Sequence, residues 1–303
     1  MIKYNAIIVL EDLNSGFKRG RQKVEKQVYQ KFEKMLIDKL NFLVNKKAKN
    51  GEICSLRNAL QLTNKFEGFQ NIGKQNGFIF YVPAWNTSKM DPTTGFVNLI
   101  DTRYKSIEES KKLFNNFQSI TYNKKELYFE FHIHDYKLFN TISDGTKTDW
   151  IICSYGDRII TERNKNQNNE WCSTKVCLTN EWTKFLEKND IDVNSNIKES
   201  ILCKNDKEFF REGLSLLGLT LQMRNSIPNT FEDFMISPIK NANGTFFDSR
   251  KSEKTLPLNA DANGAYNIAR KGLWIVNQIN NSSKNEKLNL SISNKDWLKL
   301  SQE

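Results

Sequence analysis

The longest apolar runs in this sequence are Ala6–Leu10 and Phe78–Trp85, and each has the length of one β-strand. The first lies within residues 4–11 and is followed by turn-forming residues at Asp12–Gly16; the second is expected to end at Pro83. Short apolar runs bounded by turn signals are typical of buried strands. Both runs are far shorter than the ~20 residues of a membrane-spanning helix. We therefore expect a chain built around buried strands, without a membrane segment.

Two stretches have the periodicity of amphipathic helices, with apolar residues three and four positions apart. The first runs from Lys23 to about Asn45 and carries Val24, Val28, Phe32, Met35, Leu36, Leu40 and Leu43. The second covers Asp261–Gln278, with a predicted buried stripe of Ala265, Ile268, Ala269, Leu273, Ile275 and Val276. Together with the two strands these helices make half of an α/β layer, because a sheet of two strands is marginal without partners.

The sequence between these two parts has a different character. Aromatic-rich strand candidates at Leu127–Ile133 and Trp150–Ser154 alternate with loops rich in Asn and Lys. Helical patterns occur at Lys105–Phe117, Trp182–Lys188 and Asp206–Arg224. We interpret the middle of the chain as a separate α+β insertion. The expected division is therefore 1–86, 87–257 and 258–303.

The composition indicates a polyanionic partner and a reducing compartment. The formal net charge is +10 and the sequence pI is about 9.2, which suits nucleic acid. A ribosome-associated, membrane-surface or merely basic protein has the same charge. The five cysteines form no C-x-x-C pair and are odd in number, so a disulfide scaffold is not expected and the cytoplasm fits best.

Two acidic residues occupy positions where carboxylates can carry chemistry. Glu11 ends the first strand, where α/β proteins tend to place ligand groups, and Asp261 opens the last helical pattern among small residues. Brought together, two carboxylates can hold hard divalent cations. Taken singly, a Glu at a strand end is usually solvated and an Asp at a helix start is usually an N-cap. The residues alone leave these alternatives open.

Longer motifs carry a family resemblance. The segments AIIVLEDLNSGFKRGR, FIFYVPAWNTSKMDPTTGFVN, LQMRNS, ISPIKNANGTFFDSR and NADANGAYNIARKGL occur in this order along the chain. In sequence and order they resemble the C-terminal nuclease part of the type V-A CRISPR effectors, which are RNA-guided DNA endonucleases. The resemblance covers essentially the whole chain. It implies an α/β fold class: a partial RNase H-like (RuvC) fold with an inserted α+β Nuc domain.

The same resemblance implies roles for individual residues. Glu11 matches the second RuvC carboxylate and Asp261 the third, which together would hold two Mg²⁺ ions for phosphodiester hydrolysis. Arg224 matches a Nuc-domain arginine needed for efficient cleavage, and Asp233 matches a further acid of that domain. From the residues alone, a structural ion pair of Arg224 in a helix is the simpler interpretation.

Other polar groups are weaker candidates. The basic turn of Lys18, Arg19, Arg21 and Lys23 is expected to meet a nucleic-acid backbone, although a solvated turn before the helix is nearly as good an interpretation. His132 and His134 share one side of a probable strand and more simply line the surface than bind metal. The segment TSKMDPTTGF resembles a place where distant relatives carry zinc-binding cysteines; it has none, so no zinc is expected.

The resemblance also implies something that these 303 residues do not contain. The first RuvC carboxylate of the family, like its guide-binding lobes, belongs to a segment upstream of everything matched here. We therefore expect an incomplete metal site unless that part is supplied as a separate chain, with guide RNA and target DNA as partners. A catalytically inactive nucleic-acid-binding fragment and a gene fragment that fails to fold are the alternatives.

Overall fold

The chain is described by a computed structural model over residues 7–12, 79–140, 146–164, 170–227, 232–281 and 291–302, with isolated positions at 28, 31–32, 34–36, 39, 47, 49 and 230. It divides into two compact units, one of Met1–Thr87 with Tyr266–Ser293 and one of Ser88–Ala265 with Asn294–Glu303. Both helices and strands are present, so the predicted mixed α/β class is confirmed. None of the helices in these ranges is long and apolar enough to cross a membrane.

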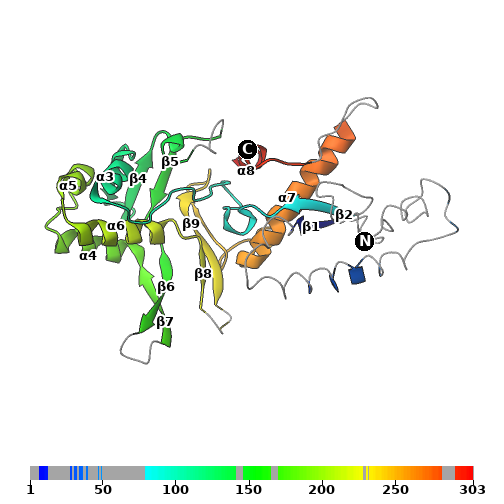
Figure 1. The fold of residues 1–303 in the computed structure, drawn as a ribbon, viewed down its shortest axis with the longest axis horizontal. Coiled ribbons are helices and arrows are strands. Elements are labelled where there is room, and N and C mark those ends of the chain that lie inside the picture. Colours follow the sequence, from blue (N-terminus) through cyan, green and yellow to red (C-terminus); the bar gives the residue numbers. More distant parts are fainter. Residues whose placement is uncertain are drawn as a thin grey trace. The chain divides into compact units, whose positions relative to one another are not determined.

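The first unit contains the two predicted strands. β1 (Ile8–Asp12) and β2 (Ile79–Pro83) pair in parallel, and β2 ends at Pro83 as expected. Helix α7 (Ala260–Asn281), which belongs to this unit from Tyr266 onward, packs on the pair (Figure 1). Val82 and Ile275 are the buried centre of this small core. The local strand and helix patterns thus produced the elements that the sequence predicted.

The buried face of α7 differs from the predicted stripe. Exposed positions within that stripe are Ala265, Ala269 and Leu273. Asn267 and Lys271 are buried in their place. Asn267 Nδ2 donates to Thr87 O at 2.9 Å, and Lys271 Nζ donates to Pro83 O at 2.6 Å. The prediction was wrong because backbone carbonyls at and beyond the end of β2 need donors when buried, and α7 supplies them from its inner face.

Gly272 allows α7 to approach β1 closely. A Cβ at this position would overlap Val9 Cγ2 and lie 2.9 Å from Val9 Cγ1, and a β-branched side chain has little rotamer freedom to move away. We expect Gly272→Ala to destabilise the first unit by about 1–3 kcal/mol through overpacking. The matched control is Gly264→Ala on the same helix, where the nearest atom is Ser88 Cβ at 3.6 Å. Urea denaturation of the full chain measures both; equal midpoints would contradict this packing.

The helix predicted from Lys23 to Asn45 lies mostly outside the described residues. Those that are described, from position 28 to 39, are helical. The predicted helix is thus confirmed at these positions, and the rest of it stays a prediction. Val28, Phe32 and Met35, which carry its apolar spacing, are more than half exposed in the part of the chain that the structure describes.

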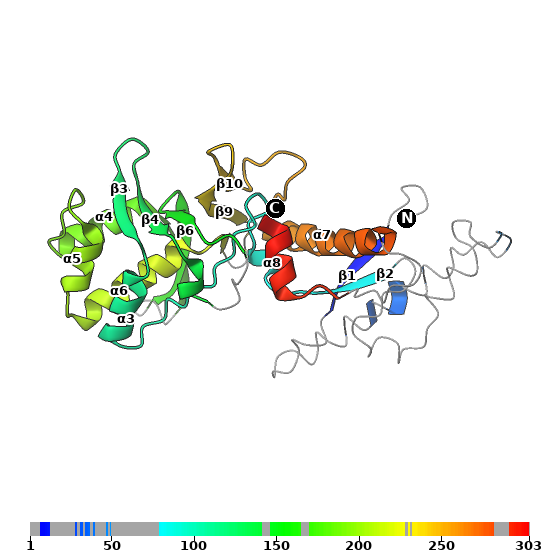
Figure 2. The ribbon, with the colours of Figure 1, turned by 90° about the horizontal axis from the view of Figure 1, so that it is seen from above.

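The core of the second unit is a three-stranded antiparallel sheet covered by helices. The sheet has the order β3 (Ser119–Asn123), β4 (Tyr128–Ile133), β5 (Trp150–Cys153). Four helices gather around it (Figure 2): α3 (Ile107–Asn115), α4 (Leu178–Lys188), α5 (Ile197–Cys203) and α6 (Lys207–Thr220). Phe129 and Phe131 of β4 are fully buried, whereas Glu130 between them and His132 after them are only half-buried and face the other side. This alternation is the pattern of a sheet with one covered face.

A second sheet and a ribbon complete this unit. The second sheet has the order β10 (Phe246–Asp248), β9 (Asp233–Lys240), β8 (Arg224–Ser226). β6 (Asp157–Asn164) and β7 (Glu170–Cys177) form an antiparallel ribbon that extends from the unit (Figure 1). The remaining elements are the 3₁₀ turns η3 (Thr87–Lys89) and η4 (Tyr136–Leu138) and helix α8 (Asn294–Gln302). The identity of residues 87–257 as a Nuc domain stays a prediction.

Candidate functional site

Glu11 lies near the carboxyl end of β1, opposite Val82 of β2. This edge of a parallel strand pair is where α/β proteins position ligand groups. The side chain is half-buried. Burial raises the pKa of the Glu11 carboxyl above its ordinary value, and the positive charge of Lys271 opposes this rise. The first unit therefore holds a carboxylate at a sheet edge, within the field of a buried ammonium group.

Lys271 is a functional candidate that the sequence analysis missed. Its Nζ donates to Pro83 O at 2.6 Å and lies 3.3 Å from Trp85 O. Burial lowers the pKa of its ammonium group to about 8, against the opposing effect of Glu11. The signal in the sequence is its spacing: Lys271 is three residues after Ile268 and four before Ile275, where an amphipathic helix has an apolar residue. A lysine at such a position indicates buried acceptors.

Arg224 lies on a strand, although the sequence predicted it at the end of a helix. Helix α6 ends at Thr220. Arg224–Ser226 then pairs antiparallel with β9, so that Arg224 lies opposite Met235 and Ser226 opposite Asp233. The helical spacing of the apolar residues continues through Met223, but pairing with β9 determines the backbone there, because tertiary context overrides local propensity.

Three of the predicted site residues come together in the second unit. Arg224 and Asp233 share one face of the β8–β9 pair as diagonal neighbours, within reach of long side chains. Arg224 Nε lies 3.5 Å from Asp233 Oδ1, and Arg224 Nη2 lies 3.2 Å from Asp261 Oδ1. The side chains of Arg224, Asp233 and Asp261 are 41%, 24% and 80% exposed. One guanidinium thus bridges two carboxylates at the surface of the unit.

Asp261 is not the N-cap of its helix. The side chain of Asn259 has that role, because its Oδ1 accepts a hydrogen bond from Ala262 N at 2.8 Å. Asp261 is therefore released from capping and points its carboxylate into solvent from the first turn of α7, where a negative charge is favoured by the helix dipole. The alternative interpretation of Asp261 as a cap is wrong.

The remaining predicted residues are placed as follows. Glu11 belongs to the first unit and Asp261 to the second, and each is described within its own unit. The basic turn of Lys18, Arg19, Arg21 and Lys23 lies outside the described residues. Its predicted contact with nucleic acid stays a prediction.

The donor chemistry of the carboxylates suits a divalent cation. Glu11 and Asp261 offer carboxylate oxygens, the donors that Mg²⁺ prefers, and the Asp261 side chain is mostly open to solvent. Within the described part of the chain, however, no group of three or more His, Cys, Asp and Glu residues is arranged to hold a metal ion. Glu11 and Asp261 therefore fit such an ion by the chemistry of their donor atoms.

His132 and His134 each pair with a different carboxylate. His132 Nε2 lies 3.3 Å from Glu130 Oε2, and His134 Nδ1 lies 2.9 Å from Asp149 Oδ1. Asp135 Oδ1 accepts a hydrogen bond from Lys137 N at 3.0 Å and so caps η4. These contacts account for both imidazoles as surface groups of β4 and the residue that follows it.

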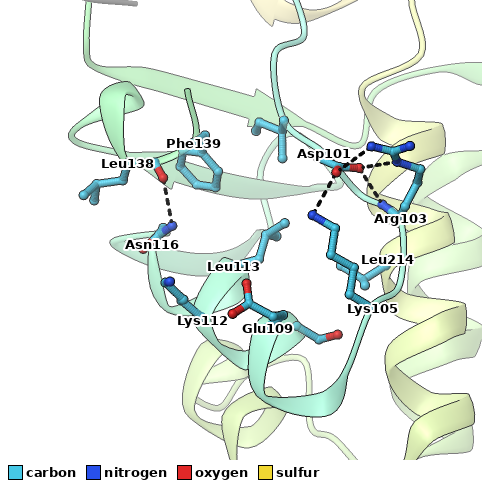
Figure 3. Close-up of a pocket in the computed structure, with 12 residues that line it drawn as sticks. Asp101, Arg103, Lys105, Glu109, Lys112, Leu113, Asn116, Leu138, Phe139 and Leu214 are labelled. Atoms are coloured by element: carbon cyan, nitrogen blue, oxygen red, sulfur yellow. Dashed lines mark hydrogen bonds and ion pairs between the residues drawn. The ribbon is translucent and has the colours of Figure 1, made fainter. Parts of the chain in front are cut away.

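A pocket of about 220 Å³ lies beside α3 in the second unit (Figure 3). Three of its charged residues pair with one another: Arg103 Nε lies 2.8 Å from Asp101 Oδ1, and Lys105 Nζ lies 3.1 Å from Asp101 Oδ2. The Arg103 hydrogen bond holds the pKa of the Asp101 carboxyl far below its ordinary value. Because the volume is below the ~300–1,000 Å³ of ligand pockets, we assign no ligand to this pocket.

Comparison with known protein families gives a match over the whole length of the chain. The family model described as RuvC nuclease domain matches residues 1–303. This match agrees with the RNase H-like α/β fold expected from the sequence. Nucleases of this kind cleave nucleic acid and generally use divalent metal ions.

Proposed function

Because the chain belongs to the RuvC nuclease domain family and is thus a nuclease, we propose that it hydrolyses DNA phosphodiester bonds as the nuclease portion of an RNA-guided type V-A CRISPR effector. The observation that carries this proposal is the bridge that Arg224 makes to Asp233 and Asp261. Arg224 lies on β8, Asp233 on the neighbouring strand β9 and Asp261 in the first turn of α7. Arg224 and Asp261 are 37 positions apart in the sequence. Their convergence is what a phosphate-handling site requires.

The proposed roles follow from the chemistry of each side chain. Asp261 and Glu11 would each offer carboxylate oxygens to divalent cations, preferably Mg²⁺. Such cations supply Lewis acidity and an activated water in phosphodiester hydrolysis. Arg224 donates to the phosphate oxygens and stabilises the charge that develops on them, because a guanidinium matches phosphate in a two-donor geometry. Asp233 holds Arg224 Nε and so orients the guanidinium toward the side of Asp261.

The RNA-guided context is supported by the ordered motifs and by the positive charge. The net charge of +10 favours a polyanion such as a guide–target duplex. In this proposal guide RNA and target DNA are the partners, and a further RuvC carboxylate comes from polypeptide beyond these 303 residues.

A second candidate function is nucleic-acid binding without turnover. It is favoured by the absence, in the described ranges, of a group of three acidic or imidazole ligands for a metal ion. This function requires the same positive net charge but no metal. It predicts DNA or RNA affinity that falls steeply with salt and does not change when Mg²⁺ is added.

Metal removal separates the two candidates. We expect the chain, dialysed against EDTA, to leave labelled DNA intact and to cleave it when Mg²⁺ is restored, in the presence of a guide RNA that matches the DNA and of the upstream part of a type V-A effector as a second polypeptide. Ca²⁺ is the matched control, since it has the same charge but longer and more variable bonds to oxygen, and should support binding with little cleavage. DNA binding without Mg²⁺-dependent cleavage, with or without the second polypeptide, would favour the alternative.

A further inference from the structure

The strand that carries Arg224 is short and lies at the edge of its sheet. β8 has only three residues, Arg224–Ser226, and its backbone partner is β9. Arg224 and Ser226 are exposed, and Asn225 between them is fully buried. Because side chains alternate across a strand, a slip of one residue would turn Arg224 inward and Asn225 outward. The direction of Arg224 therefore depends on what holds Asn225 inside.

Asn225 is held by three hydrogen bonds. Its Oδ1 accepts from Ile159 N at 3.0 Å and from Gln222 Nε2 at 3.1 Å. Its Nδ2 donates to Met223 O at 3.1 Å. A buried Asn225 amide with these partners is stable inside the protein. If the Asn225 side chain turned outward, the buried Ile159 N–H would lose its acceptor, which is unfavourable.

On the side away from β9, β8 is joined to the protein by side-chain hydrogen bonds and not by backbone pairing. Ile159 lies on β6, which belongs to a different sheet. Asn225 Oδ1 accepts from the N–H of Ile159, and Gln222 Nε2 donates to the carbonyl of Ile159 at 3.2 Å. Both backbone groups of Ile159 thus point away from its partner Lys175 on β7, as in a non-hydrogen-bonded antiparallel pair. Two amide side chains from LQMRNS therefore clasp one residue of β6.

We propose that Asn225, supported by Gln222, is a positioning residue for Arg224: its buried amide locks β8 onto β6 so that Arg224 faces Asp233 and Asp261. The inference rests on the proposed function only for the consequence in catalysis. The hydrogen bonds of Asn225 and Gln222 that hold β8 do not depend on the proposed function. The motif LQMRNS thereby contains both Arg224 and the two amide side chains, Gln222 and Asn225, that orient it.

Asn225→Leu tests this inference, because leucine has a similar size and lacks the amide. If Arg224 contacts the scissile phosphate, displacing it by about 1 Å costs on the order of 100-fold in single-turnover cleavage. The discriminating measurement is a double-mutant cycle. We expect Asn225→Leu to slow cleavage in the wild-type background and to have no further effect in the Arg224→Ala background. Gln222→Leu should give the same pattern with a smaller loss, and it serves if Asn225→Leu does not fold.

The matched control is Asn189→Leu. Asn189 Nδ2 donates to Phe185 O at 2.7 Å at the end of α4, so its loss lowers the melting temperature without touching β8. Asn189→Leu should leave the cleavage rate unchanged. Equal slowing by Asn225→Leu with and without Arg224 would show a general structural role and overturn the inference, while the proposed function would stand.

A direct structural measurement keeps the inference testable without activity. In a crystal structure or an Arg Nε NMR spectrum of Asn225→Leu, the guanidinium of Arg224 should have left Asp233 and Asp261, and the amide of Ile159 should exchange faster with solvent. A variant whose Arg224 still bridges both carboxylates contradicts the inference. If Arg224→Ala itself cleaves at the wild-type rate, the proposed role of Arg224 fails, and the position of Arg224 in Asn225→Leu still decides the inference.

Discussion

Asp261→Asn and Glu11→Gln are each expected to reduce Mg²⁺-dependent DNA cleavage by more than about 100-fold. Loss of a group that merely orients a metal ligand costs about 10- to 100-fold, and removal of a ligand charge should cost at least as much. Both substitutions keep the size of the side chain and remove its negative charge. Single-turnover cleavage of end-labelled DNA over a range of Mg²⁺ concentrations measures the effect, and a rise in the Mg²⁺ concentration needed for half the maximal rate would identify a ligand.

The control for Asp261→Asn is Asp149→Asn. Asp149 is also an exposed aspartate in the second unit with a nitrogen partner, since its Oδ1 lies 2.9 Å from His134 Nδ1 and its side chain is 68% exposed. It should change neither the rate nor the Mg²⁺ dependence. Cleavage at the wild-type rate in both Asp261→Asn and Glu11→Gln would rule out the carboxylate mechanism.

Arg224→Ala is expected to slow cleavage by about 100- to 1,000-fold, the usual loss when one donor to a developing oxyanion is removed. The loss should appear in the rate of bound substrate more than in DNA affinity, because a donor that acts on developing charge contributes in the transition state. Arg224→Lys should recover only part of the rate, since an ammonium group keeps the charge but not the planar pair of donors.

The role of Asp233 gives this prediction an internal check. Asp233→Asn keeps an oxygen near Arg224 Nε but removes the charge that holds it. The cleavage rate of Asp233→Asn should lie between those of wild type and Arg224→Ala. Adding Asp233→Asn to Arg224→Ala should cause no further loss of rate. A large loss of DNA affinity in Arg224→Ala with an unchanged rate of bound substrate would show that Arg224 is a binding residue.

The sequence by itself determined the elements whose signals are local. The apolar runs that became β1 and β2 are short and bounded by turn residues, and the spacing within 261–278 is helical, so each pattern is readable from neighbouring residues. The motif match placed Glu11, Arg224, Asp233 and Asp261 on the list of candidates before any contact among them was known. Even the signal of Lys271 was local: a charged residue at an apolar position of α7.

Only the tertiary structure decided which way these residues face. Arg224 follows a helix whose apolar spacing continues through Met223, but it lies on β8 because β9 pairs with it and Asn225 bonds to β6. Asp261 looks like a helix cap until Asn259 is seen to fill that role. The inner face of α7 carries Asn267 and Lys271 among its apolar residues because carbonyls at and beyond the end of β2 lie against it. The physical reason is the same in each case: a buried hydrogen-bonding group takes whatever partner the fold brings to it, and partners remote in sequence leave no periodicity to read.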